Sequence, residues 1–124
     1  VMAVEVRSIP RTHTEPLKVR IVPLPVAPDD YRLRYKTTDR AFYDEARLAS
    51  GADEVIFADP EGRLTEGSFT SVFVERDGVL VTPPLARGLL PGVLRNKLIA
   101  EGKAIEGDLT ASDLEGGFLL GNML

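Results

Sequence analysis

The sequence has no cysteine, a single histidine (His13) and no long apolar run. Without cysteine there is no disulfide framework and no thiol nucleophile, and one histidine cannot build a multi-histidine metal site. No segment approaches the roughly 20 apolar residues that cross a bilayer, and the first residues lack the basic-then-apolar order of a signal peptide. These absences argue against zinc and cysteine catalysis. They predict a cytoplasmic protein with no metal site and no membrane partner.

Basic residues are also scarce. The 124 residues contain 15 Lys and Arg against 19 Asp and Glu, a net charge of -4, and the basic residues form no cluster. A surface that binds nucleic acid needs such a cluster, so we expect no nucleic-acid partner. The length, with 44% hydrophobic residues, suits one domain. Because the chain begins in a strand-like alternation and stops in the apolar "GFLLGNML", we expect it to be a fragment of a longer protein.

The pattern of apolar residues predicts an α+β fold. Alternation of period two favours strands, and a meander of antiparallel strands should run from residue 53 to residue 84. The predicted strands are 1–9, 17–23, 31–36, 53–59, 64–75, 79–84, 103–109 and 117–121. A helix within 37–51 should bury Phe42, Ala46 and Ala49 and end near Gly51. A second helix should follow Pro91, and a short third one should cover 112–116.

Three features could carry chemistry. Lys36 lies where the predicted strand 31–36 meets the helix that follows, although most lysines are solvated surface charges. Glu66 lies inside a predicted strand between apolar residues, so it could be a partly buried acid, and a buried carboxylate needs a partner. The third is "LLPGVLRN" (89–96), where the first amides of a helix lack intrahelical acceptors and favour an anion. An ordinary helix that begins after a proline explains this stretch equally well.

Together the three features match the needs of pyridoxal phosphate. This cofactor requires a lysine that forms a Schiff base, an acid opposite its ring nitrogen and a cradle for its phosphate. The lysine must become a free amine to move protons, and burial near a cationic ring favours that state.

Four segments resemble a known family in the same order and spacing. They are "LRYKTTDR" (33–40), "DEVIFADPEGRLTEGSFTSVFV" (53–74), "VTPPLARGLLPGVLR" (81–95) and "GFLLGN" (117–122). They resemble the large domain of the fold-type IV pyridoxal-phosphate enzymes, which comprise branched-chain aminotransferases, D-amino acid aminotransferases and aminodeoxychorismate lyases. The resemblance implies a mainly antiparallel, barrel-like β-sheet domain with a few helices.

The resemblance assigns roles to individual residues. The family's Schiff-base lysine falls on Lys36, which would also be the catalytic proton carrier. Its ring-nitrogen carboxylate falls on Glu66, and Leu90 would pack on the ring.

The phosphate contacts of the family fall on two other segments. The helix start corresponds to Gly92, Val93 and Leu94. The turn after the last strand corresponds to Asn122 and Met123.

Finer features favour the lyases. The aminotransferases usually carry a tyrosine five positions after the lysine, where this chain has Ala41, and Gly-Thr-Ala at the last turn, where it has Gly-Asn-Met. Ser71 and Asp39 stand where asparagine is common in the family and in the lyases respectively. The leading interpretation is a lyase that converts 4-amino-4-deoxychorismate into 4-aminobenzoate and pyruvate for folate biosynthesis. The alternatives are a class IV aminotransferase and a non-catalytic interaction domain with a decayed site.

The resemblance also implies partners. We expect residues 1–124 to be the C-terminal large domain, whose smaller N-terminal domain, with an arginine for the phosphate, is absent from this chain. A homodimer, a fused aminodeoxychorismate synthase subunit and a small-molecule substrate are further expectations. The isolated fragment should bind the cofactor weakly and turn over little.

Overall fold

The computed structural model describes residues 18–33 and 41–122. The predicted strand 1–9 and the residues Lys36, Asp39 and Met123 lie outside this part of the chain.

The α+β fold class is confirmed, but the described strands form two open mixed sheets and no closed barrel. One sheet has the order β1-β2-β3, in which β2 is parallel to β1 and antiparallel to β3. The other has the order β6-β5-β4-β7, in which β4 is antiparallel to β5 and β7, and β6 is parallel to β5. The strands are β1 (Val19–Pro23), β2 (Glu54–Ala58), β3 (Leu64–Gly67), β4 (Ser71–Arg76), β5 (Val79–Thr82), β6 (Ala104–Glu106) and β7 (Leu119–Gly121).

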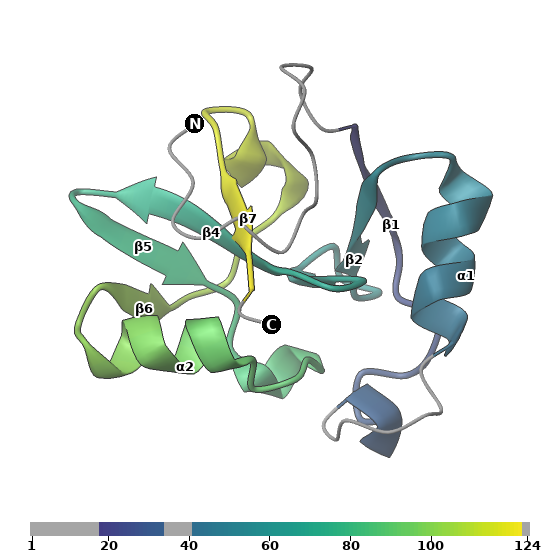
Figure 1. The fold of residues 1–124 in the computed structure, drawn as a ribbon, viewed down its shortest axis with the longest axis horizontal. Helices are drawn as coiled ribbons and strands as arrows, with labels where there is room; N and C mark the ends of the chain where they lie inside the picture. The colour runs from purple at the N-terminus through teal and green to yellow at the C-terminus, as the bar shows by residue number, and fades with distance from the viewer. Residues whose placement is uncertain (1–17, 34–40, 123–124) are drawn as a thin grey trace.

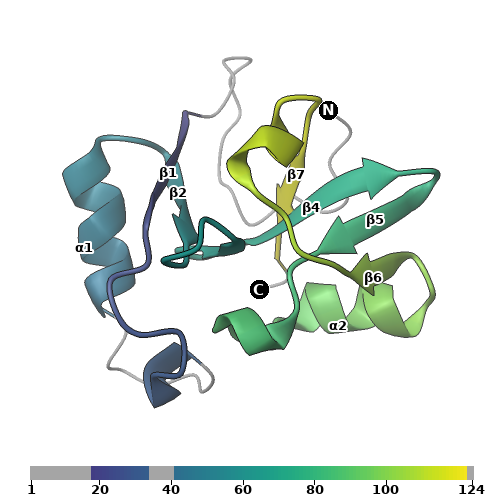
Figure 2. The same ribbon diagram turned by 180° about the vertical axis from the view of Figure 1, so that it is seen from behind.

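The helices cover the two sheets separately. Figure 1 shows α1 beside β1 and β2 and α2 along β5 and β6, and Figure 2 shows the same division from behind. The helical elements are α1 (Ala41–Ser50), α2 (Val93–Ala100) and the 3-10 turns η1 (Tyr31–Leu33), η2 (Leu85–Arg87) and η3 (Ala111–Leu114). Among the described residues, no helix has the length and apolar character needed to span a membrane.

One predicted strand is in fact two. We expected residues 64–75 to form a continuous strand, but β3 ends at Gly67 and β4 begins at Ser71, in different sheets. The intervening turn is closed by a hydrogen bond from the Gly67 amide to the Thr70 carbonyl oxygen (2.8 Å). Phe69 is the only large apolar residue between Leu64 and Val72, so the apolar pattern does not locate the break.

Residues 31–33 form a 3-10 turn where the sequence predicted extended chain. Asp30 explains the difference, because its side chain accepts from the Arg32 amide (2.9 Å) and its carbonyl oxygen from the Leu33 amide (3.0 Å). Such local side-chain bonds compete with strand formation.

The helix predicted within 37–51 is present as α1, and Gly51, at φ +73, ends it as expected. Its buried face is the predicted one only in part. Phe42 and Ala46 pack on the sheet with Tyr43, which is 2% exposed, whereas Ala49 is exposed.

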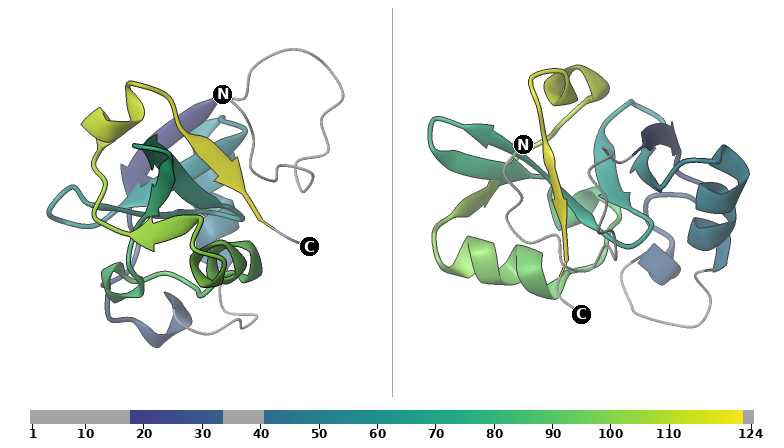
Figure 3. Two further views of the ribbon diagram at one scale, coloured as in Figure 1. Left: turned by 90° about the vertical axis from the view of Figure 1, so that its left-hand side faces the viewer. Right: turned by 45° about the horizontal axis from the view of Figure 1, so that its top comes forward.

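Within the described part of the chain, the core consists of three clusters that follow this architecture. One lies between the sheets and joins Ile56 and Leu64 of the first sheet to Val72 and Val81 of the second. A second packs α1 on β2. In the third, Leu94 and Leu98 of α2 are both buried, which confirms the predicted apolar face of this helix. The right-hand view of Figure 3 shows α1 (blue) and α2 (green) at opposite ends of the molecule, each beside its own sheet.

Candidate functional site

Glu66, the predicted buried acid, lies in β3 and is 7% exposed. Its Oε2 accepts a hydrogen bond from the Tyr43 hydroxyl (3.2 Å) and one from the Leu90 amide (3.3 Å). The structure thus gives the carboxylate the partners that burial requires. It also brings Glu66 together with Leu90, a second predicted site residue 24 positions away.

Tyr43 was missed in the sequence analysis. Its ring stacks on Phe57 with 4.1 Å between centroids and an interplanar angle of 18°, and Phe42 meets it edge-on at 5.3 Å. The stacked ring directs the hydroxyl toward Glu66, as expected of a buried tyrosine that needs a polar partner. A tyrosine on the first turn of an otherwise amphipathic helix is the signal that could have pointed to it.

The predicted helix start adjoins the carboxylate. Gly92 is the N-cap of α2, and its amide donates to the Leu90 carbonyl oxygen (2.9 Å), so segment 90–92 connects Glu66 to the helix. Val93 and Leu94 are the first two helical residues, whose amides have no acceptor within the helix. Leu94 is buried and anchors the helix, while the Val93 side chain is 66% exposed.

The start of β4 and the end of β7 border the same region. A methyl group on Gly92 would lie 3.4 Å from the Ser71 hydroxyl, so the helix start approaches the first residue of β4 closely. The Asn122 side chain donates through Nδ2 to the Phe69 carbonyl oxygen, whereas its Oδ1 is buried and has no hydrogen-bond partner among the described residues. Buried acceptors of this kind in native proteins are normally paired with protein, water or ligand.

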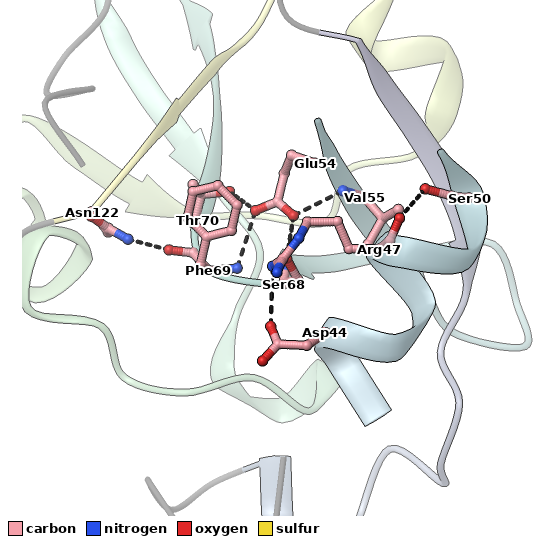
Figure 4. Close-up of polar contacts among 9 residues, drawn as sticks. All are labelled: Asp44, Arg47, Ser50, Glu54, Val55, Ser68, Phe69, Thr70 and Asn122. Carbon is pink, nitrogen blue, oxygen red and sulfur yellow. Dashed lines mark hydrogen bonds and ion pairs between the residues drawn. The ribbon is translucent and has the colours of Figure 1, made fainter. Parts of the chain in front are cut away.

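Glu54 is the second residue that the sequence analysis missed. This glutamate at the start of β2 is fully buried, and its carboxylate contacts the turn between β3 and β4, as Figure 4 shows. Its neighbours in sequence, Asp53 and Val55, give no hint of this, because a glutamate before an apolar strand is usually exposed.

The described part of the site suits a ligand with an anionic end and a cationic ring nitrogen. A carboxylate (Glu66) stands at one side of segment 90–92 and two helix-start amides (Val93 and Leu94) stand at the other. The first can accept from a protonated ring nitrogen, and the second can donate to a phosphate. The predicted residues Lys36 and Met123 lie outside the described residues. Their positions relative to Glu66 and the helix start therefore stay predictions.

Comparison with known proteins gives a consistent result. The family model described as "Amino-transferase class IV" matches residues 1–124. The branched-chain-amino-acid aminotransferase of Pseudomonas aeruginosa is 40% identical over 52 residues, which cover 42% of this chain and 17% of that protein. A Schizosaccharomyces pombe protein named "Putative aminodeoxychorismate lyase" is 36% identical over 78 residues, which cover 59% of this chain and 34% of that protein.

Solved structures share the fold. A crystal structure from Mesorhizobium loti, titled "Putative amino-acid aminotransferase", superimposes with a TM-score of 0.76 and 37% identity. The superposition covers 89% of this chain and 56% of that one. This chain therefore corresponds to about half of that solved chain, and the matches to the two curated relatives cover smaller shares of their length.

Proposed function

This chain is a member of the amino-transferase class IV family, and on that basis we propose that it forms the cofactor-binding domain of a 4-amino-4-deoxychorismate lyase. The predictions of a class IV enzyme and of pyridoxal phosphate as its cofactor are confirmed at the level of the family. The observation that carries the proposal for this chain is the buried Glu66 carboxylate, joined through Leu90 to the start of α2.

The described residues fit pyridoxal phosphate at its ring nitrogen and at its phosphate. Glu66 would hold the protonated ring nitrogen, with Tyr43 and the Leu90 amide keeping its Oε2 in place. The amides of Val93 and Leu94 would bind the phosphate. When bound, the cofactor supplies an electron-accepting ring that stabilises negative charge on the substrate.

The remaining roles follow from the family correspondence. We propose Lys36 as the lysine that binds the cofactor covalently and carries the proton removed from the substrate, Leu90 as the residue packed on the ring, and Asn122 and Met123 as further phosphate contacts. The buried Oδ1 of Asn122, which has no hydrogen-bond partner within residues 18–33 and 41–122, is available to a donor on a ligand or on water. A proton carrier must sit near its working pKa, and burial beside a cationic ring lowers the pKa of a lysine.

Three observations favour a lyase over an aminotransferase. Ala41, which begins α1, stands where aminotransferases of this family usually have tyrosine, and the last turn reads Gly-Asn-Met. The similarity to the S. pombe protein also extends over 78 residues, against 52 for the P. aeruginosa enzyme. The higher identity of the latter, 40%, supports an aminotransferase of branched-chain or D-amino acids as the second candidate.

The domain organisation is part of the proposal. We propose that residues 1–124 are the large domain of the protein and that a smaller N-terminal domain supplies an arginine to the phosphate. A homodimer and a fused aminodeoxychorismate synthase subunit are proposed partners. A charge-assisted contact is worth roughly 1.5 to 3 kcal/mol, so this chain alone should bind the cofactor about ten to a hundredfold more weakly than the full-length protein.

The test is a product assay on the full-length protein and on this chain. We expect release of 4-aminobenzoate and pyruvate from 4-amino-4-deoxychorismate without any α-keto acid, and loss of product in Lys36→Ala and Glu66→Gln. Glu75→Gln, at an exposed position of β4, is the matched control. Product that appears only with an α-keto acid acceptor would establish the aminotransferase instead. Cofactor-free protein with no turnover of either kind would favour the non-catalytic domain.

A further inference from the structure

We propose that Glu54 is a positioning residue for the cofactor site. Its buried carboxylate holds the turn of residues 68–70, which connects the two sheets between Glu66 and the start of β4. The link to cofactor binding rests on the proposed function, whereas the hold on the turn rests on the contacts alone.

The first observation is the set of bonds that the carboxylate accepts. Its Oε1 accepts from the amides of Val55 (2.8 Å) and Ser68 (3.0 Å) and from the Ser68 hydroxyl (2.5 Å). Its Oε2 accepts from the Phe69 amide (3.1 Å) and the Thr70 hydroxyl (2.9 Å). Both oxygens therefore bind the turn, at 0% exposure. Because these partners all donate, a carboxylate satisfies them and a carboxamide of the same shape does not.

The second observation is the space left at Gly67. A methyl group there would lie 2.5 Å from Glu54 Oε2, 2.9 Å from its carboxyl carbon and closer still to the Thr70 hydroxyl. The glycine that ends β3 thus makes room for the carboxylate at the point where the chain leaves the first sheet. The position of the Glu54 carboxylate therefore depends on the absence of a side chain at Gly67.

The third observation concerns charge. Arg47 of α1 donates to the Ser68 hydroxyl (2.8 Å), which in turn donates to Glu54, and its guanidinium lies 5.3 Å from the centre of the Phe69 ring. Figure 4 shows Arg47 reaching the turn from the side opposite Asn122. Arg47 also pairs with Asp44 at 3.1 Å. The Ser68 hydroxyl therefore links the positive charge of Arg47 to the buried Glu54 carboxylate. Among the described residues, Glu54 forms no direct ion pair.

The turn is attached to the candidate site at three points. Glu66 precedes Gly67 directly, the Phe69 carbonyl oxygen accepts from the Asn122 side chain, and Ser71 borders Gly92 at the helix start. A turn released from Glu54 would therefore change the relative positions of the carboxylate and of the groups proposed to bind the phosphate. Glu54 itself would touch neither the cofactor nor the substrate.

The experiment uses the full-length protein and the isosteric change Glu54→Gln, with Glu75→Gln as the control. Two quantities are measured: the equilibrium affinity for pyridoxal phosphate and the amide hydrogen exchange of the cofactor-free protein. We expect affinity to fall about tenfold or more, since hydrogen bonds to a charged group are lost. Exchange at Ser68 and Phe69 should accelerate by a similar factor, while exchange at Leu98 of α2 stays within twofold.

Two results would overturn the inference. One is unchanged affinity and unchanged exchange at the turn. The other is faster exchange of Leu98 to the same degree as the turn, which would make Glu54 a residue of general stability. If Glu54→Gln does not fold, Thr70→Val removes one donor to the carboxylate and should give the same pattern with a smaller effect. Absence of cofactor binding by the unsubstituted protein would refute the proposed function, and the exchange data would still decide whether Glu54 holds the turn.

Discussion

Replacing Gly67 by alanine tests the packing at the junction of the sheets. The added methyl group would lie within 3.0 Å of Glu54 and of Thr70, and Glu54 is too deeply buried to move into solvent. Moving the carboxylate would break at least one bond to its Oε2, worth roughly 1.5 to 3 kcal/mol for a charged acceptor. Overpacking typically adds about 1 to 3 kcal/mol. We therefore expect Gly67→Ala to lower the free energy of unfolding by about 2.5 to 6 kcal/mol, a large share of a typical domain's stability.

The assay is urea denaturation followed by circular dichroism, with Gly116→Ala as the matched control. A methyl group at Gly116 would meet no atom within 4 Å, so that change should stay within about 0.5 kcal/mol. In a Glu54→Ala background, where the contacts with the carboxylate are gone and only the one with the Thr70 hydroxyl remains, the cost of Gly67→Ala should be clearly smaller. Equal stability of the two alanine variants, or an undiminished cost in the Glu54→Ala background, would refute the steric argument.

Two further predictions concern regions away from the junction. The guanidinium of Arg32, bonded to Asp30 at 2.9 and 3.0 Å, lowers the pKa of that carboxyl from 3.8 to about 2. The stability that this interaction contributes is thus complete above pH 4 and is lost as the pH falls through about 2. Carbon NMR should show the low midpoint, and Asp30→Asn should remove this part of the acid dependence. Leu98→Ala in the α2 core should lower the unfolding free energy by about 2 to 5 kcal/mol, whereas Leu48→Ala, at a position that is 75% exposed, should change it by less than about 0.5, both measured by denaturation.

The sequence predicted best what depends on local pattern. The apolar spacing of Leu94 and Leu98 located α2 and its buried face, and Gly51 located the end of α1. The fold class followed from the alternation of apolar residues. The phosphate-binding role of the helix start stays a prediction, because it requires a ligand to test it.

What the sequence could not predict depends on contacts between distant residues. The turn that separates β3 from β4 is bound by Glu54, which lies 14 to 16 positions earlier in the sequence. Tyr43 reaches Glu66 only because α1 packs on β2. The spacing of apolar residues within one segment carries no information about contacts with a distant segment. The extended chain predicted at 31–33 failed for a local reason instead, since the Asp30 side chain competes with strand hydrogen bonds.

The turn at 68–70 divides the candidate site between two sheets. Glu66 belongs to β3 in the first sheet, while the helix start and Asn122 adjoin the second. A rigid, planar ligand bound to both sheets would therefore restrain their relative motion, since sliding one sheet against the other would strain the ligand's hydrogen bonds at both ends. Ligand binding would then stabilise the native state by mass action. The stabilisation would act on the contact between the two sheets rather than within either sheet. A bound cofactor would therefore increase the cooperativity with which the two sheets unfold.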